Sequence, residues 1–121
     1  MTAPNIIGVT SVTGETDVLE VTTSPSVITQ NANASNAVYK INSLIVSNVD
    51  GASSSDVSVD LFRGGTPYYF TRLVTVPANS TLVIMSRENA IYLEEGDALR
   101  ITASTNGDLQ SICSYDIITD Q

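Results

Sequence analysis

The stretch that decides the fold is Ile91-Tyr92-Leu93-Glu94-Glu95-Gly96-Asp97-Ala98-Leu99-Arg100-Ile101-Thr102. Its first three residues are apolar and β-prone, and an acidic turn containing a glycine follows them. After the turn, apolar residues alternate with Arg100 and Thr102, which is the two-residue period of a strand with one buried face. No residue of this segment is a strong nucleophile, so the segment predicts framework rather than chemistry.

The same rhythm of strand and turn continues through the chain from Ala37. The run Val38–Val49 predicts one long strand with a bulge near Asn42-Ser43, because its apolar residues change parity there. Asp50-Gly51 is a strong turn signal. No segment has the apolar spacing of an amphipathic helix. About eight strands joined by polar turns predict an all-β, antiparallel β-sandwich, and the strand count leaves jelly-roll and immunoglobulin-like topologies open.

The first part of the sequence has a weaker strand pattern. Two short β-prone pieces, Asn5–Thr10 and Val18–Thr22, are separated by glycine and acidic residues, and Pro25 interrupts the pattern. We predict that residues 1–24 form an extended N-terminal arm or edge strands, and that residues 25–121 form the β-sandwich domain. The alternative is that both early pieces are ordinary strands of the sandwich.

Composition excludes some classes of partner. The 121 residues include 5 basic and 13 acidic side chains, which gives a net charge of −8 at pH 7. Such a charge repels phosphate backbones and anionic lipid headgroups, so we expect no nucleic-acid partner and no membrane partner. The longest apolar run, Leu82–Met85, is far too short to span a bilayer. Met1–Asn5 lacks the basic and apolar regions of a secretory signal.

The single cysteine, Cys113, has no second cysteine with which to form an internal disulfide. It lies between Ile112 and Ser114 in a β-prone run, so we expect a small buried strand residue. The chain has no histidine that would activate a thiolate. We expect synthesis in a reducing cytoplasm, because the fold does not depend on disulfides.

The chemistry available to the chain is limited to carboxylates. The absence of histidine excludes Ser–His–Asp triads and Cys–His dyads, and with one cysteine it leaves no zinc site. Glu94, Glu95 and Asp97 cluster in one turn, where a hard cation such as Ca²⁺ is an alternative. The simpler interpretation is a tight hairpin in which Gly96 has a positive φ and the acids face water. We therefore predict no enzymatic activity, no cofactor and no metal, and only a slight effect of Glu95→Ala or Asp97→Ala.

Candidate interface residues come from two places in the sequence. Tyr68-Tyr69-Phe70 forms an aromatic cluster between Arg63 and Arg72, and tyrosine and arginine are favoured anchors of interfaces. The alternative is that Phe70 fills the core and the tyrosines cover its rim. A tyrosine platform for sugars is a further, weaker alternative. The predicted interface residues are Tyr68, Tyr69 and Arg72 of this cluster, and Ile6, Ile7 and Val9 of the arm.

Three segments resemble small virion structural proteins of tailed bacteriophages, especially those of marine bacteria and cyanobacteria. The segments are Val38–Gly51, Val74–Val83 and Ile91–Asp97, and the ending Leu109–Ile118 is also similar. Together they cover roughly residues 37–119, in the same order and spacing. The shared motifs are strands and turns, so the resemblance carries over no binding residues.

The resemblance implies a non-enzymatic virion subunit that is made in the host cytoplasm and repeated many times in the particle. A capsid decoration (cement) protein is the leading expectation, and a neck, tail or fibre component is the alternative. Its implied partners are other virion proteins, such as the major capsid protein or neck and tail subunits. A homo-oligomer is expected, with a trimer favoured by analogy. A carbohydrate- or cell-surface-binding β-sandwich module is the runner-up from another class.

Overall fold

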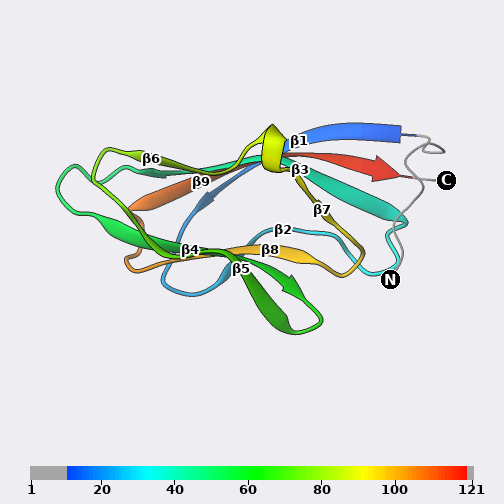
Figure 1. The fold of residues 1–121 in the computed structure, drawn as a ribbon, viewed down its shortest axis with the longest axis horizontal. Coiled ribbons are helices and arrows are strands. Elements are labelled where there is room, and N and C mark those ends of the chain that lie inside the picture. The colour runs from blue at the N-terminus through cyan, green and yellow to red at the C-terminus, as the bar shows by residue number, and fades with distance from the viewer. Residues whose placement is uncertain (1–10, 120–121) are drawn as a thin grey trace.

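Residues 11–119, which the computed structural model describes, form two antiparallel sheets stacked face to face (Figure 1). Sheet A has the strand order β1-β9-β3-β6, with β7 also paired to β3, and sheet B has the order β2-β8-β4-β5. This all-β sandwich confirms the predicted fold class. In this part of the chain, no helix has the length and apolar character needed to cross a bilayer. The elements are β1 Ser11–Glu20, β2 Ser26–Gln30, β3 Ala37–Asn48, β4 Ser55–Arg63, β5 Thr66–Val76, β6 Thr81–Met85, the 3-10 helix η2 Arg87–Asn89, β7 Ile91–Leu93, β8 Ala98–Ala103 and β9 Leu109–Thr119.

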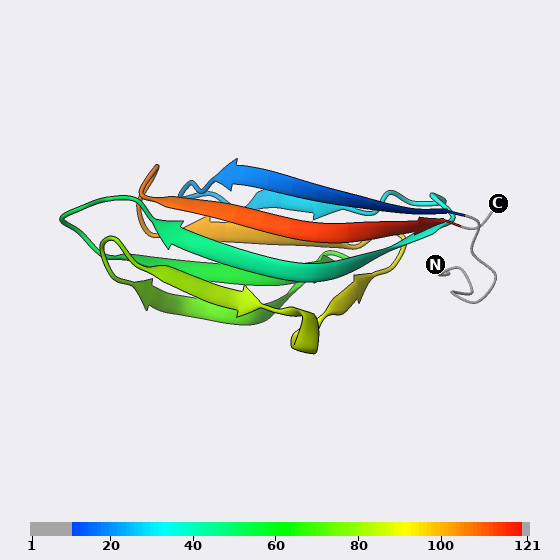
Figure 2. The ribbon, with the colours of Figure 1, turned by 90° about the horizontal axis from the view of Figure 1, so that it is seen from above.

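The strands are connected as a jelly roll. β4 pairs with β5, β3 pairs with β6 and β7, β2 pairs with β8, and β1 pairs with β9. The chain is therefore one long hairpin, wrapped so that successive pairs fall alternately in sheet B and sheet A. Viewed from above, β1, β9, β3 and β6 lie side by side across sheet A (Figure 2). This order decides the topology that the strand count leaves open.

Alternating apolar residues of the two sheets meet in the core. Strand β3 changes parity there, because Asn42 is an extra residue relative to β9: Ile41 pairs with Tyr115 and Ser43 with Ser114. The bulge predicted near Asn42-Ser43 is therefore confirmed. Completely buried side chains include Val57, Val59, Leu99 and Ile101 from sheet B and Ile41, Leu44 and Val46 from sheet A.

Strand β1 is an edge of sheet A. It pairs with β9 along its whole length, from Ser11 opposite Thr119 to Glu20 opposite Gln110. The next residue, Val21, is completely buried in the core. The predicted boundary between residues 24 and 25 stays a prediction. The predicted arm contacts Ile6, Ile7 and Val9 lie outside the described residues.

Buried asparagines hold the chain where it crosses from one sheet to the other. Asn48, at the end of β3, donates from Nδ2 to the carbonyl oxygens of Ser53 at 3.0 Å and Val76 at 2.9 Å. Its Oδ1 accepts from the backbone N–H of Asp50 at 2.9 Å. Asn31, which follows β2, links β3 and β7 in a similar way. Both side chains satisfy backbone groups at these crossings.

We predict that Asn48→Ala lowers the free energy of unfolding by about 1–3 kcal/mol, because it leaves buried carbonyl groups without donors. Urea unfolding followed by circular dichroism measures the change. Asn89→Ala, at an exposed position of η2, is the matched control and should change stability by less than about 0.5 kcal/mol. Equal effects of the two substitutions would contradict the assigned role of Asn48.

Candidate functional site

The β4–β5 hairpin projects from the body of the sandwich (Figure 1). Its turn is formed by Gly64 and Gly65, whose φ angles of 61° and 82° are ones that glycine adopts without steric cost. Tyr68, Tyr69 and Phe70 follow the turn and are 56%, 49% and 40% exposed. We call residues 61–72 the aromatic hairpin. The alternative that Phe70 fills the core is wrong, because Phe70 is exposed and lies outside the core cluster.

The structure brings two of the predicted interface residues into contact. The guanidinium of Arg72 lies 5.4 Å from the ring centroid of Tyr69, within the range of a cation–π interaction. Side chains alternate along a strand, so Tyr68 points to the opposite side of β5 from Tyr69. The aromatic hairpin therefore presents aromatic surface on both of its sides. The role of Tyr68, Tyr69 and Arg72 at an interface stays a prediction.

An ion pair lies beside these residues on sheet B. Tyr69 is opposite Asp60 in the strand register, and Asp60 is only 3% exposed. The Asp60 carboxylate accepts from Nε of Arg100 at 3.0 Å. The same guanidinium lies 3.9 Å from the ring centroid of Phe62. These contacts hold the strands beneath the hairpin in a defined register.

A second ion pair joins the aromatic hairpin to the turn between β7 and β8. Arg63 donates to both carboxylate oxygens of Asp97, at 2.8 Å from Nε and 2.5 Å from Nη2, and to Glu94 at 3.2 Å. The hydrogen bond to Asp97 raises the pKa of Arg63 further above its ordinary value. Asp97 is completely buried and also accepts from the backbone N–H of Glu94 at 2.8 Å. We call this arrangement the Arg63 clamp.

The expectation that the acids of this turn face water is therefore wrong for Asp97. The reason is the arginine at the end of β4, which brings a fixed positive charge to the turn. Glu95 is also largely buried, and its Oε2 accepts from the backbone N–H of Asn36 at 2.6 Å. The positive φ of Gly96, 89°, agrees with the prediction. Sequence reasoning missed the clamp, because no local pattern pairs residues that are 34 positions apart.

The turns enclose a shallow hollow but no metal centre. The hollow has a volume of about 410 Å³ and is lined by residues of both turns together with Gln30, Asn33 and Phe62. Within residues 11–119, the structure contains no group of three or more His, Cys, Asp or Glu side chains that could hold a metal ion. The carboxylates of Glu94, Glu95 and Asp97 bond to protein donors instead. Chemically, the site is built to hold a hairpin in place.

Two buried side chains of β9, Cys113 and Tyr115, have raised pKa values. Cys113 is completely buried, as the sequence predicts, and burial raises the pKa of its thiol from 9.0 to about 12. Burial also raises the pKa of Tyr115 to about 12, and its hydroxyl donates to Asp17 at 2.8 Å. A raised folded-state pKa stabilises the fold below the ordinary pKa. This contribution is lost as the pH rises from about 9 toward 12.

No protein-family model matches the sequence, and no curated protein matches it. Solved structures do match. A protein of the Bacillus endospore appendages, described as a novel family of disulfide-linked pili, superposes with a TM-score of 0.54 at 14% identity. The match covers 92% of this chain and 90% of that chain. At this identity, the comparison shows the fold alone and does not extend to function.

Two structures of a pentameric capsid protein isolated from metagenomic phage sequences match less closely. Their TM-scores are 0.43 and 0.41, at 17% and 15% identity. Each match covers 84% of this chain but only 60% and 59% of the capsid protein. These scores are too low to carry an argument about this chain.

We predict that Asp97→Ala lowers the free energy of unfolding by about 1.5–3 kcal/mol, because it removes charged hydrogen bonds from a buried position. Arg63 is partly exposed and is rehydrated in the variant, which keeps the loss below that of a fully buried pair. Glu94→Ala is the control. It removes an exposed partner of the same arginine and should cost less than about 1 kcal/mol. A similar, slight loss in both variants would restore the expectation that the acids face water.

We also predict that the thiol of Cys113 in the folded protein reacts with Ellman's reagent at least about 100-fold more slowly than in the urea-unfolded chain. Its burial and raised pKa remove both access and thiolate. The unfolded chain should release one equivalent of chromophore, since it has one cysteine. Rapid stoichiometric reaction of the folded protein would show that β9 opens readily.

Proposed function

We propose that this chain is a non-enzymatic structural subunit of a bacteriophage particle, most simply a capsid decoration protein. The observation that carries the proposal is the aromatic hairpin, where three consecutive aromatic side chains are exposed on an edge strand beside an arginine. Exposed aromatic residues and arginine are the commonest anchors of protein interfaces. The hairpin would insert them into a neighbouring virion protein, with the major capsid protein as the expected partner.

The construction of the hairpin supports this role. The Arg63 clamp fixes the hairpin beside its turn, and the Arg72–Tyr69 contact restrains the side chain of Tyr69. An anchor that is already ordered loses less conformational entropy on binding than a flexible one. The aromatic hairpin therefore combines exposure with rigidity, which a side chain that merely covers the core does not need.

Fold and charge are compatible with the proposal. A jelly roll is a frequent architecture of viral capsid domains, although the fold does not decide function. The fold is also shared with a protein whose family forms pili. The disulfide linkage described for that family is not available here, because this chain has one cysteine and it is completely buried. The net charge of −8 keeps copies apart before assembly.

The copy number of the chain in purified particles tests the proposal. Quantitative mass spectrometry against the major capsid protein should give a count comparable to that of the shell protein. A count of only a few copies would support a neck, tail or fibre component instead. Absence from the particle would overturn the virion assignment.

We predict that Tyr69→Ala combined with Arg72→Ala reduces incorporation into particles at least about tenfold, because loss of an interface anchor typically costs more than about 1.4 kcal/mol. Particles assembled without the subunit and then incubated with it provide the measurement. The exposed residue Tyr92 of β7 lies on the other sheet, so Tyr92→Ala is the matched control and should bind normally. Equal incorporation of the two variants would contradict the role of the hairpin.

A carbohydrate-binding module is the second candidate, because exposed aromatic rings beside an arginine also suit sugars. The two functions differ in what the isolated protein binds. A glycan-binding module retains affinity for oligosaccharides without any particle, and Tyr69→Ala abolishes it. Glycan-array binding by the wild-type protein would favour this alternative over the virion subunit.

A further inference from the structure

A row of four apolar side chains crosses the outer face of sheet A. Val18 of β1 pairs with Ile112 of β9, Ile112 pairs with Ile45 of β3, and Ile45 pairs with Val83 of β6. The residues before and after Ile45 are completely buried in the core, so Ile45 and its partners point outward. We call Val18, Ile112, Ile45 and Val83 the outer row.

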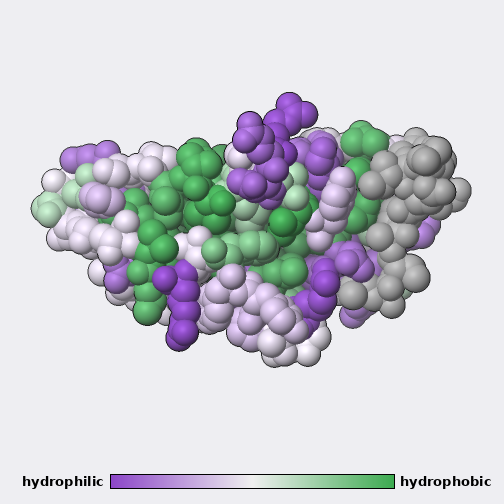
Figure 3. Space-filling view, in the orientation of Figure 1, coloured by the Kyte–Doolittle hydropathy of each residue, from purple (hydrophilic) through white to green (hydrophobic). Residues whose placement is uncertain are grey.

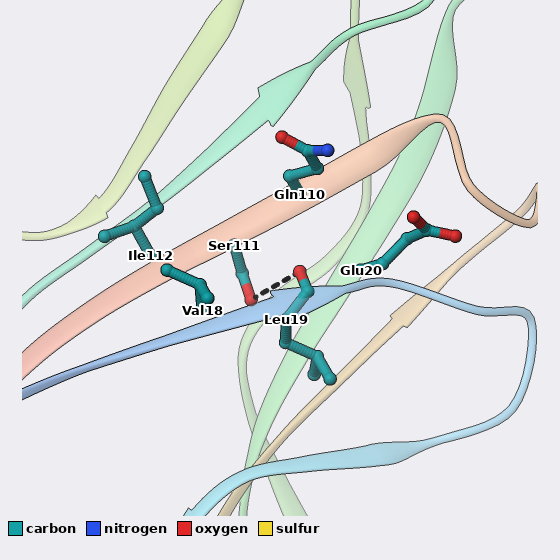
Figure 4. A pocket seen from close by; sticks show the side chains of 6 residues that line it. All are labelled: Val18, Leu19, Glu20, Gln110, Ser111 and Ile112. Atoms are coloured by element: carbon teal, nitrogen blue, oxygen red, sulfur yellow. Dashed lines mark hydrogen bonds between the residues drawn. The ribbon is translucent and has the colours of Figure 1, made fainter.

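Three residues of the outer row are well exposed, and Ile45 is half-buried. Val18 is 75% exposed, Val83 is 61% exposed and Ile112 is 39% exposed. Figure 4 shows Val18 and Ile112 side by side, with Leu19 pointing to the opposite side of β1. In the space-filling view, apolar residues also gather over β6, the strand that carries Val83 (Figure 3). Single exposed apolar residues are ordinary, but a contiguous row across a whole sheet marks an interaction surface.

The surroundings of the outer row are polar and nearly neutral. The neighbouring rows on its two sides consist of Glu20, Gln110, Ser47 and Thr81, and of Thr16, Ser114 and Ser43. Hydroxyl groups pair across strands in both, at 3.2 Å between Ser47 and Thr81 and at 3.1 Å between Thr16 and Ser114. The charged side chains on this face of the described strands are Glu20, Lys40 and Asp116. With two negative charges and one positive, the face has a net charge of −1, compared with −8 for the chain.

We propose that the outer row is the contact through which two copies of this chain pack sheet A against sheet A about a twofold axis. A second copy is the occupant that fits, because the row reads valine, isoleucine, isoleucine, valine and is the same in both directions. An isologous contact requires this self-complementarity. A face that is nearly neutral also lets two otherwise acidic copies approach.

The hollow beside the row defines how the copies fit together. It has a volume of about 330 Å³ and is lined on the outer face by Val18, Glu20, Gln110 and Ile112 (Figure 4). We place the twofold axis parallel to the strands, between Ile112 and Ile45. Val83 of the second copy then enters this hollow beside Val18. Ile112 of each copy then lies over Ile45 of the other. Glu20 faces a threonine rather than a second Glu20.

The size of the contact predicts its strength. Four strands about 4.8 Å apart, overlapping along about 20 Å, bury on the order of 800–1,000 Å² in total, the low end for a specific interface. We therefore expect a reversible dimer rather than a permanent one. A twofold contact differs from the trimer favoured by analogy and goes beyond the proposed virion function, because it concerns the isolated protein.

Sedimentation velocity of the purified chain from about 1 µM to about 500 µM tests the inference, since weak interfaces have dissociation constants in this range. The wild-type protein should show a monomer–dimer equilibrium. Val83→Asp should weaken dimerisation at least about tenfold, because it places a charge against the apolar side chain of Val18 and beside the carboxylate of Glu20 of the other copy. Val27→Asp is the matched control: Val27 is 47% exposed on β2 of sheet B, and its variant should dimerise like the wild type. A wild-type monomer at all concentrations, or normal dimerisation of Val83→Asp, would overturn the proposal.

Val83→Asn separates desolvation from net charge. It leaves the charge of the chain unchanged, yet it should weaken the dimer as Val83→Asp does, because it places a polar group against apolar side chains. If Val83→Asn dimerises normally, repulsion alone explains the aspartate variant and the outer row is not the contact. Circular dichroism melting of each variant shows that it is folded.

A short bis-maleimide cross-linker tests the orientation of the copies. The double variant Val18→Cys, Val83→Cys should give covalent dimers, whereas each single variant should give few. The native thiol of Cys113 does not interfere, because it is buried. Efficient cross-linking of the single variants would overturn the proposed axis. The virion function is tested by the particle copy number, and the dimer is tested on the isolated protein. Failure of one proposal therefore does not decide the other.

Discussion

The bulge at Asn42 in β3 is the constraint on which the rest of the structure depends. Strand β3 pairs with β9, β6 and β7, so its register decides which side chains of sheet A face inward. The side-chain period of a strand is two, and a one-residue slip would exchange the two faces. By inserting Asn42, the chain places both Ile41 and Leu44 in the core, while Ile45 points outward. The same bulge therefore produces the core and the outer row.

Two buried carboxylates form ion pairs that join neighbouring elements of sheet B. Asp97 and Asp60 are almost completely buried, and each is paired with an arginine from a different strand. A buried carboxylate without such a partner would be strongly destabilising, so these pairs also specify which turns lie together. The Arg63 clamp fixes the turn end of the hairpin that presents Tyr68 and Tyr69.

The sequence predicts the parts of this structure that are governed by local patterns. The sandwich and the bulge follow from alternating burial, and a buried Cys113 follows from its place in an apolar strand. The environment of Asp97 could not be predicted, because its partner is 34 positions away and only the register brings Arg63 to it. Whether Phe70 fills the core could not be predicted for a related reason. The position of its strand at the edge of the sheet depends on the order of the strands, which local patterns do not give. The outer row was hidden entirely, since Val18 and Ile112 are neighbours only through the pairing of the first and last described strands.

The two exposed features lie on opposite layers of the molecule. The aromatic hairpin belongs to sheet B, whereas the outer row crosses the outer face of sheet A. Under the two proposals, one layer of a subunit binds a shell neighbour while the other layer contacts a second copy. The net charge of −8 opposes association everywhere except where apolar or aromatic groups outweigh it. Selectivity for the two proposed contacts then follows from the distribution of charge. Under the proposed virion function, the weak dimer contact gains strength because many copies are held close together on one particle.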